Sequence, residues 1–180
     1  DVYKRQAIVG RYVGETALAA VGASYALTSI FICIAIGGGI GASVIISHHF
    51  GAHNYGRMKT GIRTALLSFL FISLILGGIG LIFSQQIMEV LNTPADAIDI
   101  AVTYLNIYFL GLPFLFMYNI LSSMFNALGE SRIPLYLLIF SSVLNIFLDL
   151  YMVAVLNLGV AGAAYATFIA QGISAVLSLI

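Results

Sequence analysis

Charged side chains are scarce in this chain. They make up 8% of its 180 residues, whereas soluble domains carry about 25%. So few charges cannot coat a surface that faces water, and 61% of the residues are hydrophobic. The net charge is zero and Lys and Arg form no cluster, which argues against nucleic acid as a partner. The composition therefore indicates a membrane protein.

Other scarcities narrow the class further. Cysteine occurs once, at Cys33, so the chain cannot form an internal disulfide. Segments of about ten residues with alternating hydrophobicity, which are typical of membrane β-barrels, are missing. The sequence also lacks a nucleophile with its base, a phosphate-binding loop and a pair of carboxylates. It therefore does not support an enzyme. Long apolar stretches remain, and they predict an all-α polytopic membrane protein.

The few charges divide the sequence into apolar spans. We expect five, at about 17–47, 64–88, 98–126, 133–156 and from Val160 onward. Gly129 predicts a helix stop, followed by a tight loop and a restart led by Pro134. Thr93 is the expected N-cap of the third span, with Pro94 in its first helical position and Asp96 in its first turn.

The loop charges predict an orientation. The loop at 48–63 contains Arg57, Lys59 and Arg63, and the loop at 129–133 contains Arg132. The loops at 89–99 and 157–160 contain no Lys or Arg. Short loops rich in Lys and Arg stay in the cytoplasm, so we expect the first two loops there and the other two outside.

Asp149 is the most informative residue. It is the only charged side chain after Arg132 and lies in a run apolar enough for lipid. A carboxylate at the centre of a membrane helix costs about 2.5–3.5 kcal/mol on insertion scales, so such groups usually face a cavity or a partner. Asn145 precedes it by one helical turn, on the same face. We expect the functional site here.

Polar side chains recur along one face of each of the last three spans. If these faces meet, they enclose a polar cavity within the membrane. The alternative is that the groups only form hydrogen bonds that hold the helices together. The candidate cavity residues are Tyr104, Tyr118, Asn119 and Ser122 in the third span, Ser142 with Asn145 and Asp149 in the fourth, and Thr167 and Gln171 in the fifth.

Three further features suggest structure more than function. His49 and His53 are four residues apart and could bind a metal, but cationic side chains also suit a helix end, and we predict no metal site. The glycines from Gly37 to Gly41 include a GxxxG spacing that predicts close helix contact. Pro113 predicts a kink, which serves either packing or a hinge.

Several segments resemble one family of efflux transporters, the multidrug and toxic compound extrusion (MATE) family. They occur in the family's order: IVGRYVGETALAAVGAS, GIGASVIISHHFGAHN, YLNIYFLGLPF, NALGESRIPLY, LNIFLDLYMV and GVAGAAYATFIAQ. The resemblance implies a fold of twelve helices in two lobes. This chain would be most of the N-terminal six-helix lobe, from the end of helix 1 through helix 6, and its partner would be the missing C-terminal lobe.

The resemblance also implies a function. These transporters export cationic or amphipathic drugs across the cytoplasmic membrane, in exchange for H⁺ or Na⁺ and without another cofactor. Asn145 and Asp149 match the ion-coupling pair of helix 5. Tyr104, Ser122 and Thr167 match positions that line the same pocket, although the family often has Asn in place of Ser122. Expected partners are a drug-like substrate and membrane lipid.

The start of the chain departs from the family. Residues 1–6 look like a non-native leader, and we assign residues 7–180 to the transmembrane lobe. The resemblance implies an acidic residue shortly before Val9, where this sequence has Lys4 and Arg5, so we expect the chain as written not to transport.

Two other functions stay open. A flippase of lipid-linked saccharides could share the fold, although such proteins usually line the cavity with Arg or Lys. A non-transporting scaffold subunit would leave Asp149 without a purpose.

Overall fold

The chain forms a bundle of long helices. The computed structural model describes residues 15–179, and the expected leader at 1–6 lies outside that range. The helices are α2 (Glu15–Gly51), α3 (Tyr55–Val90), α4 (Ile98–Ala127), α5 (Arg132–Asp149) with the π-helical turn η1 (Leu150–Val155), and α6 (Gly159–Leu177). All five spans are long and apolar enough to cross a membrane, and the described residues contain no strand. The all-α multi-pass prediction is confirmed.

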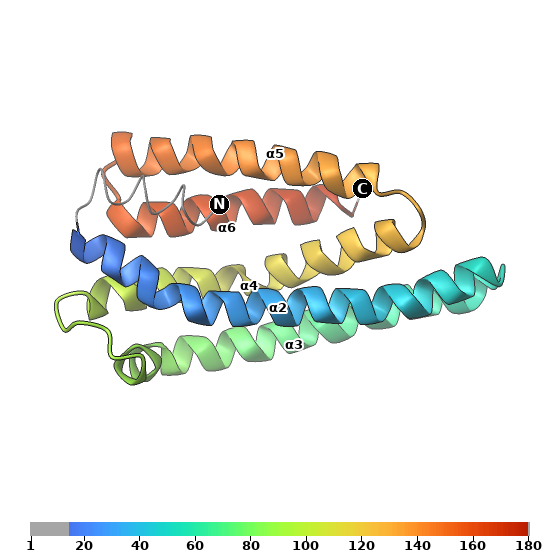
Figure 1. Cartoon of the computed structure of the whole chain (residues 1–180), viewed down its shortest axis with the longest axis horizontal. Helices are drawn as coiled ribbons and strands as arrows, with labels where there is room; N and C mark the ends of the chain where they lie inside the picture. The colour runs from blue at the N-terminus through green and yellow to red at the C-terminus, as the bar shows by residue number, and fades with distance from the viewer. Residues whose placement is uncertain (1–14, 180) are drawn as a thin grey trace.

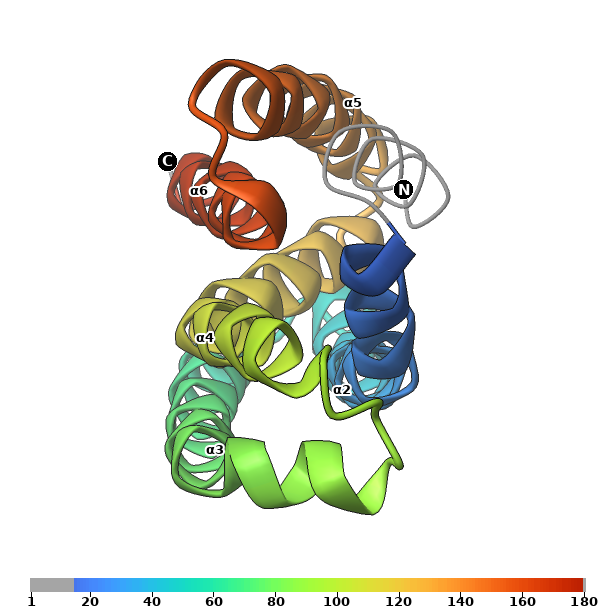
Figure 2. The same cartoon turned by 90° about the vertical axis from the view of Figure 1, so that its left-hand side faces the viewer.

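The helices lie in two groups. Figures 1 and 2 show α2, α3 and α4 together, with α5 and α6 side by side above them. α4 is the central helix: it packs against α2, α3 and α6, whereas α5 packs mainly against α6. The core therefore follows α4, where Leu105, Phe109, Leu112 and Phe116 are almost completely buried.

Small residues let α2 approach its neighbours. Glycines and other small residues permit close packing in membranes, where no hydrophobic force joins helices. Gly38 faces the ring of Phe69 on α3, and Gly39 faces Ser123 on α4, so a Cβ atom at either position would collide. Gly37 and Gly41, the pair with the GxxxG spacing, meet nothing within 4 Å. Close contact is confirmed, but it belongs to the glycines between that pair.

Pro113 lies inside α4, and Figure 1 shows this helix changing direction about half-way along. Proline has no N–H, so the carbonyl of Phe109 loses its helical donor. Gly77 of α3 packs against that carbonyl, at a point where a Cβ atom would lie 2.9 Å from the oxygen. The kink thus forms where α3 offers a surface without a side chain.

Three helix starts differ from expectation. α3 begins at Tyr55, where the Asn54 side chain accepts a hydrogen bond from the Arg57 N–H at 3.2 Å. Arg57, Lys59 and Arg63 are therefore helical rather than in a loop. The loop prediction was wrong because the exposed surface of a helix accommodates Lys and Arg side chains as well as a loop does.

α4 begins at Ile98, and Thr93 is not its N-cap: its hydroxyl contacts the Met88 sulfur at 3.6 Å instead. Gly129 does end a helix, with a left-handed φ of 86°. The restart at α5 begins with Arg132, which makes Pro134 the third helical residue rather than the first.

The connections alternate between the two ends of the bundle. Figure 1 shows the α2–α3 and α4–α5 turns at one end and the other two at the opposite end. This agrees with the grouping expected from the loop charges. Which end faces the cytoplasm stays a prediction.

Candidate functional site

A hydrogen bond between α5 and α6 lies at the centre of the candidate site. The side-chain amide of Asn145 donates to the Thr167 hydroxyl at 3.4 Å, and that hydroxyl donates to the Ala163 carbonyl of its own helix at 3.0 Å. Both side chains are buried, with exposures of 8% and 7%. Polar groups at this depth need partners, so the bond fixes the register of the two helices.

The expected polar faces do meet around a cavity, which we call the polar cavity. It has a volume of about 170 Å³. Six predicted residues line it: Tyr118, Asn119, Ser142, Asn145, Thr167 and Gln171. Its other lining residues are Ile32, Leu115, Leu138, Ser141 and Ala170. Four helices thus contribute amides, hydroxyls and apolar groups to one space.

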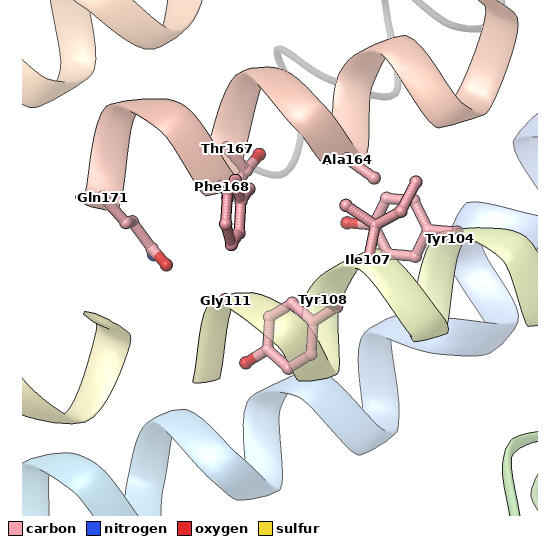
Figure 3. A pocket seen from close by; sticks show the side chains of 8 residues that line it. All are labelled: Tyr104, Ile107, Tyr108, Gly111, Ala164, Thr167, Phe168 and Gln171. Atoms are coloured by element: carbon pink, nitrogen blue, oxygen red, sulfur yellow. The ribbon is translucent and has the colours of Figure 1, made fainter. Parts of the chain in front are cut away.

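A second, narrow cavity lies between α4 and α6. Its volume is about 10 Å³, roughly enough for one water molecule. Figure 3 shows Phe168 and Gln171 extending from α6 toward Gly111 and Tyr108 of α4. Gly111 makes this approach possible, since a Cβ atom there would lie 3.2 Å from the Phe168 ring. Thr167 and Gln171 line both cavities, which are therefore neighbours.

The tyrosines of the stripe have separate positions. Tyr104 lines the narrow cavity and not the polar one. Tyr108 also lines the narrow cavity, and its hydroxyl donates to the Thr28 carbonyl of α2 at 3.2 Å. That bond ties α4 to α2 beside the narrow cavity.

Ser122 lines neither cavity formed by the described residues. Ser141 lines the polar cavity but is missing from the predicted set. The signal for it was present, because Ser141, Asn145 and Asp149 repeat at steps of four along one helical face.

Asp149 ends the α-helical part of α5 and is 2% exposed. It lines neither the polar nor the narrow cavity of the described structure, although we expected it to face one. In this arrangement the carboxylate is enclosed one turn beyond Asn145. All other charged side chains in α3, α4, α5 and the turns between them are exposed, so Asp149 is the one charge buried in that part of the chain.

His49 and His53 do not share a helix. α2 ends at Gly51, so His53 lies beyond the helix, and its Nδ1 is 3.2 Å from the Tyr55 hydroxyl. No group of three or more possible metal ligands occurs among the described residues.

Known proteins resemble the chain in sequence. The family model MatE matches residues 6–151. The probable multidrug resistance protein YoeA of Bacillus subtilis (strain 168) is 36% identical, over 89% of this chain and 36% of its own length. YpnP of the same strain, also a probable multidrug resistance protein, is 33% identical over 92% of this chain and 37% of its own length. The chain thus spans little more than a third of these curated relatives.

Solved structures resemble it in fold. The inward-facing conformation of a multidrug resistance MATE family transporter of the MOP superfamily matches 99% of this chain and 40% of that chain, with a TM-score of 0.94 and 22% identity. An outward-facing conformation matches 97% of this chain and 38% of that one, with a TM-score of 0.91 and 23% identity. The described helices therefore have the arrangement of part of such a fold.

Proposed function

The chain belongs to the MatE family, a family of transporters rather than enzymes, and on that premise we propose that it is part of a secondary active antiporter. The complete protein would export cationic or amphipathic drug-like compounds across the cytoplasmic membrane, in exchange for H⁺ or Na⁺. The names of the relatives support the drug-like substrate.

One observation carries the proposal: a buried carboxylate lies one helical turn from a polar cavity lined by membrane-spanning helices. Asp149 is 2% exposed, and Asn145 on the same face lines the cavity and bonds to Thr167. Charged groups inside a membrane are costly and usually serve ion or substrate pathways. If position 149 served helix packing alone, a neutral Asn or Ser side chain would be less costly to bury there.

Asp149 would act as the ion-loading group. A charge inside the membrane is costly, so a proton or a Na⁺ ion that neutralises the carboxylate would stabilise the enclosed arrangement. Loading then shifts the balance between outward-open and inward-open packings, because the ion binds the two with different affinity. A drug that competes for the same polar space would leave as the ion enters.

Asn145 and Thr167 would support this step. Asn145 would supply a neutral oxygen one helical turn from the carboxylate, and its side-chain amide donates to the Thr167 hydroxyl. Gln171 lies one turn further along α6 and lines both cavities, so it is placed to contact a substrate in either one.

The position of Asp149 along α5 indicates the side of ion entry. It lies seventeen residues after Arg132, or about 26 Å at the rise of an α-helix, in a hydrocarbon layer of about 30 Å. If the end that carries Arg57 and Arg132 faces the cytoplasm, Asp149 is near the outer surface. The ion would then enter from outside.

The flippase alternative has less support from the cavities. The residues that line the polar and narrow cavities include no Arg or Lys, which a pyrophosphate group would require. A scaffold function would not use the charge of Asp149 at all. Both alternatives differ from the antiport proposal in what they predict for a neutral substitution at Asp149.

The test is Asp149→Asn in the full-length transporter. This change keeps size and hydrogen bonding but removes the charge. We expect normal membrane levels with loss of drug resistance and of efflux driven by an imposed H⁺ or Na⁺ gradient. Arg132→Gln, at the exposed start of the same helix, is the matched control. Normal gradient-driven efflux by Asp149→Asn would refute the antiport proposal.

A further inference from the structure

α5 does not end as an α-helix. The six residues that follow Asp149, Leu150–Val155, form the π-helical turn η1. The Leu156 N–H donates to the Tyr151 carbonyl at 3.0 Å, five residues back instead of four. Such turns are rare and often occur at functional sites.

The turn affects which side chains face inward. Asn145, Asp149 and Val153 are all buried, at steps of four. In an α-helix of about 3.6 residues per turn, each step of four moves the side chain about 40° further around the axis. A π-turn holds more residues per turn and reduces this drift. Val153 therefore stays beneath Asp149 and packs with Val160 and Ala163 of α6.

η1 packs against the backbone of α6 at Gly162. A Cβ atom on this glycine would lie 3.1 Å from the carbonyl oxygen of Met152 and 3.0 Å from Cβ of Leu158. The Met152 carbonyl also accepts a hydrogen bond from the Leu158 N–H at 3.0 Å. Because this neighbour is backbone within a bonded turn, it cannot rotate away as a side chain would. The π-turn thus occupies a space that exists because residue 162 has no side chain.

We propose that Gly162 is a positioning residue for Asp149: it admits the Met152 carbonyl, keeps η1 in its π form, and so sets the direction in which the Asp149 carboxylate points. The inference rests on the proposed function, because it concerns the ion-coupling role of Asp149.

Gly162 acts on the balance between the π form and the α form of η1. Converting η1 to α-helix removes about one residue from the turn, which corresponds to a rotation of about 100° between the segments on its two sides. A side chain at residue 162 presses on the Met152 carbonyl and disfavours the π form. Asp149, the residue next to the turn, then changes direction relative to α6.

The experiment compares Gly162→Ala with Gly172→Ala in the full-length transporter. Gly172 lies on the same helix, but a Cβ atom there would be 3.9 Å from its nearest neighbour, Phe114, an ordinary contact. Efflux is measured against external pH and Na⁺ concentration. The reaction of Asp149 with a hydrophobic carbodiimide is followed against pH by mass spectrometry of its peptide. The second readout needs no transport.

The groups around Asp149 make this readout specific. The elements packed against α5 and η1 are α4 and α6. Their ionisable side chains are Asp99, which is exposed, and the tyrosines Tyr104, Tyr108, Tyr118 and Tyr165. Asp149 is therefore the one buried carboxyl group in α4, α5, η1 and α6.

We expect Gly162→Ala to shift the ion concentration for half-maximal efflux by at least about threefold. The pH midpoint of the carbodiimide reaction shifts with it, while drug binding is unchanged. Gly172→Ala shifts neither. If Gly162→Ala keeps both midpoints while Asp149→Asn abolishes ion dependence, the positioning role is wrong and the proposed function stands. If Asp149→Asn itself keeps ion dependence, the proposed function fails.

A second variant covers the case in which Gly162→Ala does not reach the membrane. Deleting Ala154 removes one residue from η1 and favours the α form, and the missing residue takes up the rotation of about 100° that the α form would otherwise impose. We expect the deletion to keep both midpoints and, combined with Gly162→Ala, to restore membrane levels and both midpoints, because the two changes act on one turn. Shifted midpoints in the combined variant would overturn the positioning role.

Discussion

The side-chain amide of Asn145 donates to the hydroxyl of Thr167 across the α5–α6 interface, at 3.4 Å. The two residues are 22 positions apart in the chain and both line the polar cavity. This bond therefore links the packing of two helices to the lining of the space between them, and substitutions at either end should affect both.

We expect Asn145→Ala to weaken ion coupling without abolishing it, because Asn145 assists Asp149 but carries no charge. Hydrogen bonds between membrane helices contribute on average about 0.6 kcal/mol, so the loss of stability should be small. The measurement is gradient-driven efflux in Asn145→Ala, Thr167→Val and the double variant. A double variant as active as the weaker single variant would show that the two residues act together. Fully additive losses would mean that the bond has no role in transport.

Gly77 should tolerate no side chain. A Cβ atom there would lie 2.9 Å from the Phe109 carbonyl oxygen, and backbone in the middle of α4 cannot move aside cheaply. Overpacking of this kind costs about 1–3 kcal/mol. We expect Gly77→Ala to lower the thermal stability of the detergent-solubilised protein. Gly78→Ala is the control, since nothing lies within 4 Å of a Cβ atom at that neighbouring residue. Equal melting temperatures for the two variants would contradict the packing described for the kink.

The same comparison applies to α2. Gly39→Ala meets Ser123 and the Asn119 carbonyl of α4, whereas Gly41→Ala meets open space. We expect the first change to reduce stability by about 1–3 kcal/mol and the second to have little effect. Thermal unfolding in detergent would measure both. A larger loss for Gly41→Ala would indicate that the outward glycines form a contact beyond the described residues.

The orientation can be tested by cysteine labelling of intact cells. Cys33 is exposed and should first be replaced by Ser. Single cysteines are then placed at Arg57, Arg132 and Asp96, all exposed residues. We expect a membrane-impermeant maleimide to label position 96 at once, and positions 57 and 132 only after the cells are permeabilised. Rapid labelling at position 57 with none at 96 would reverse the topology.

Hydropathy predicted the helices well because lipid imposes a simple rule on spanning segments. The third span was expected at 98–126, and α4 is Ile98–Ala127. Charge was a poorer guide to helix ends: Arg57 to Arg63 lie in the first turns of α3, where an exposed helix accommodates them. Thr93 has the right residue type for a cap, but its hydroxyl contacts Met88 instead.

The site was predicted in part for similar reasons. Faces of polar residues follow from helical periodicity, and six of the nine predicted residues line the polar cavity. Whether two faces meet at one height depends on helix register, which placed Tyr104 in the narrow cavity and Ser122 in neither. The π-turn after Asp149 was not predicted, because it packs against Gly162 through the Met152 carbonyl, and no local pattern reveals that contact.

α2 and α3 are longer than a membrane is thick. Their 37 and 36 residues span about 55 Å, more than the hydrocarbon layer of about 30 Å even at a tilt of about 40°. Figure 1 shows their shared turn extending past the end of α4. A peptide tag inserted at His53, within this turn, would therefore stay in water. An antibody could then report the sidedness of the protein from a point far from both cavities, without disturbing the helices that enclose them.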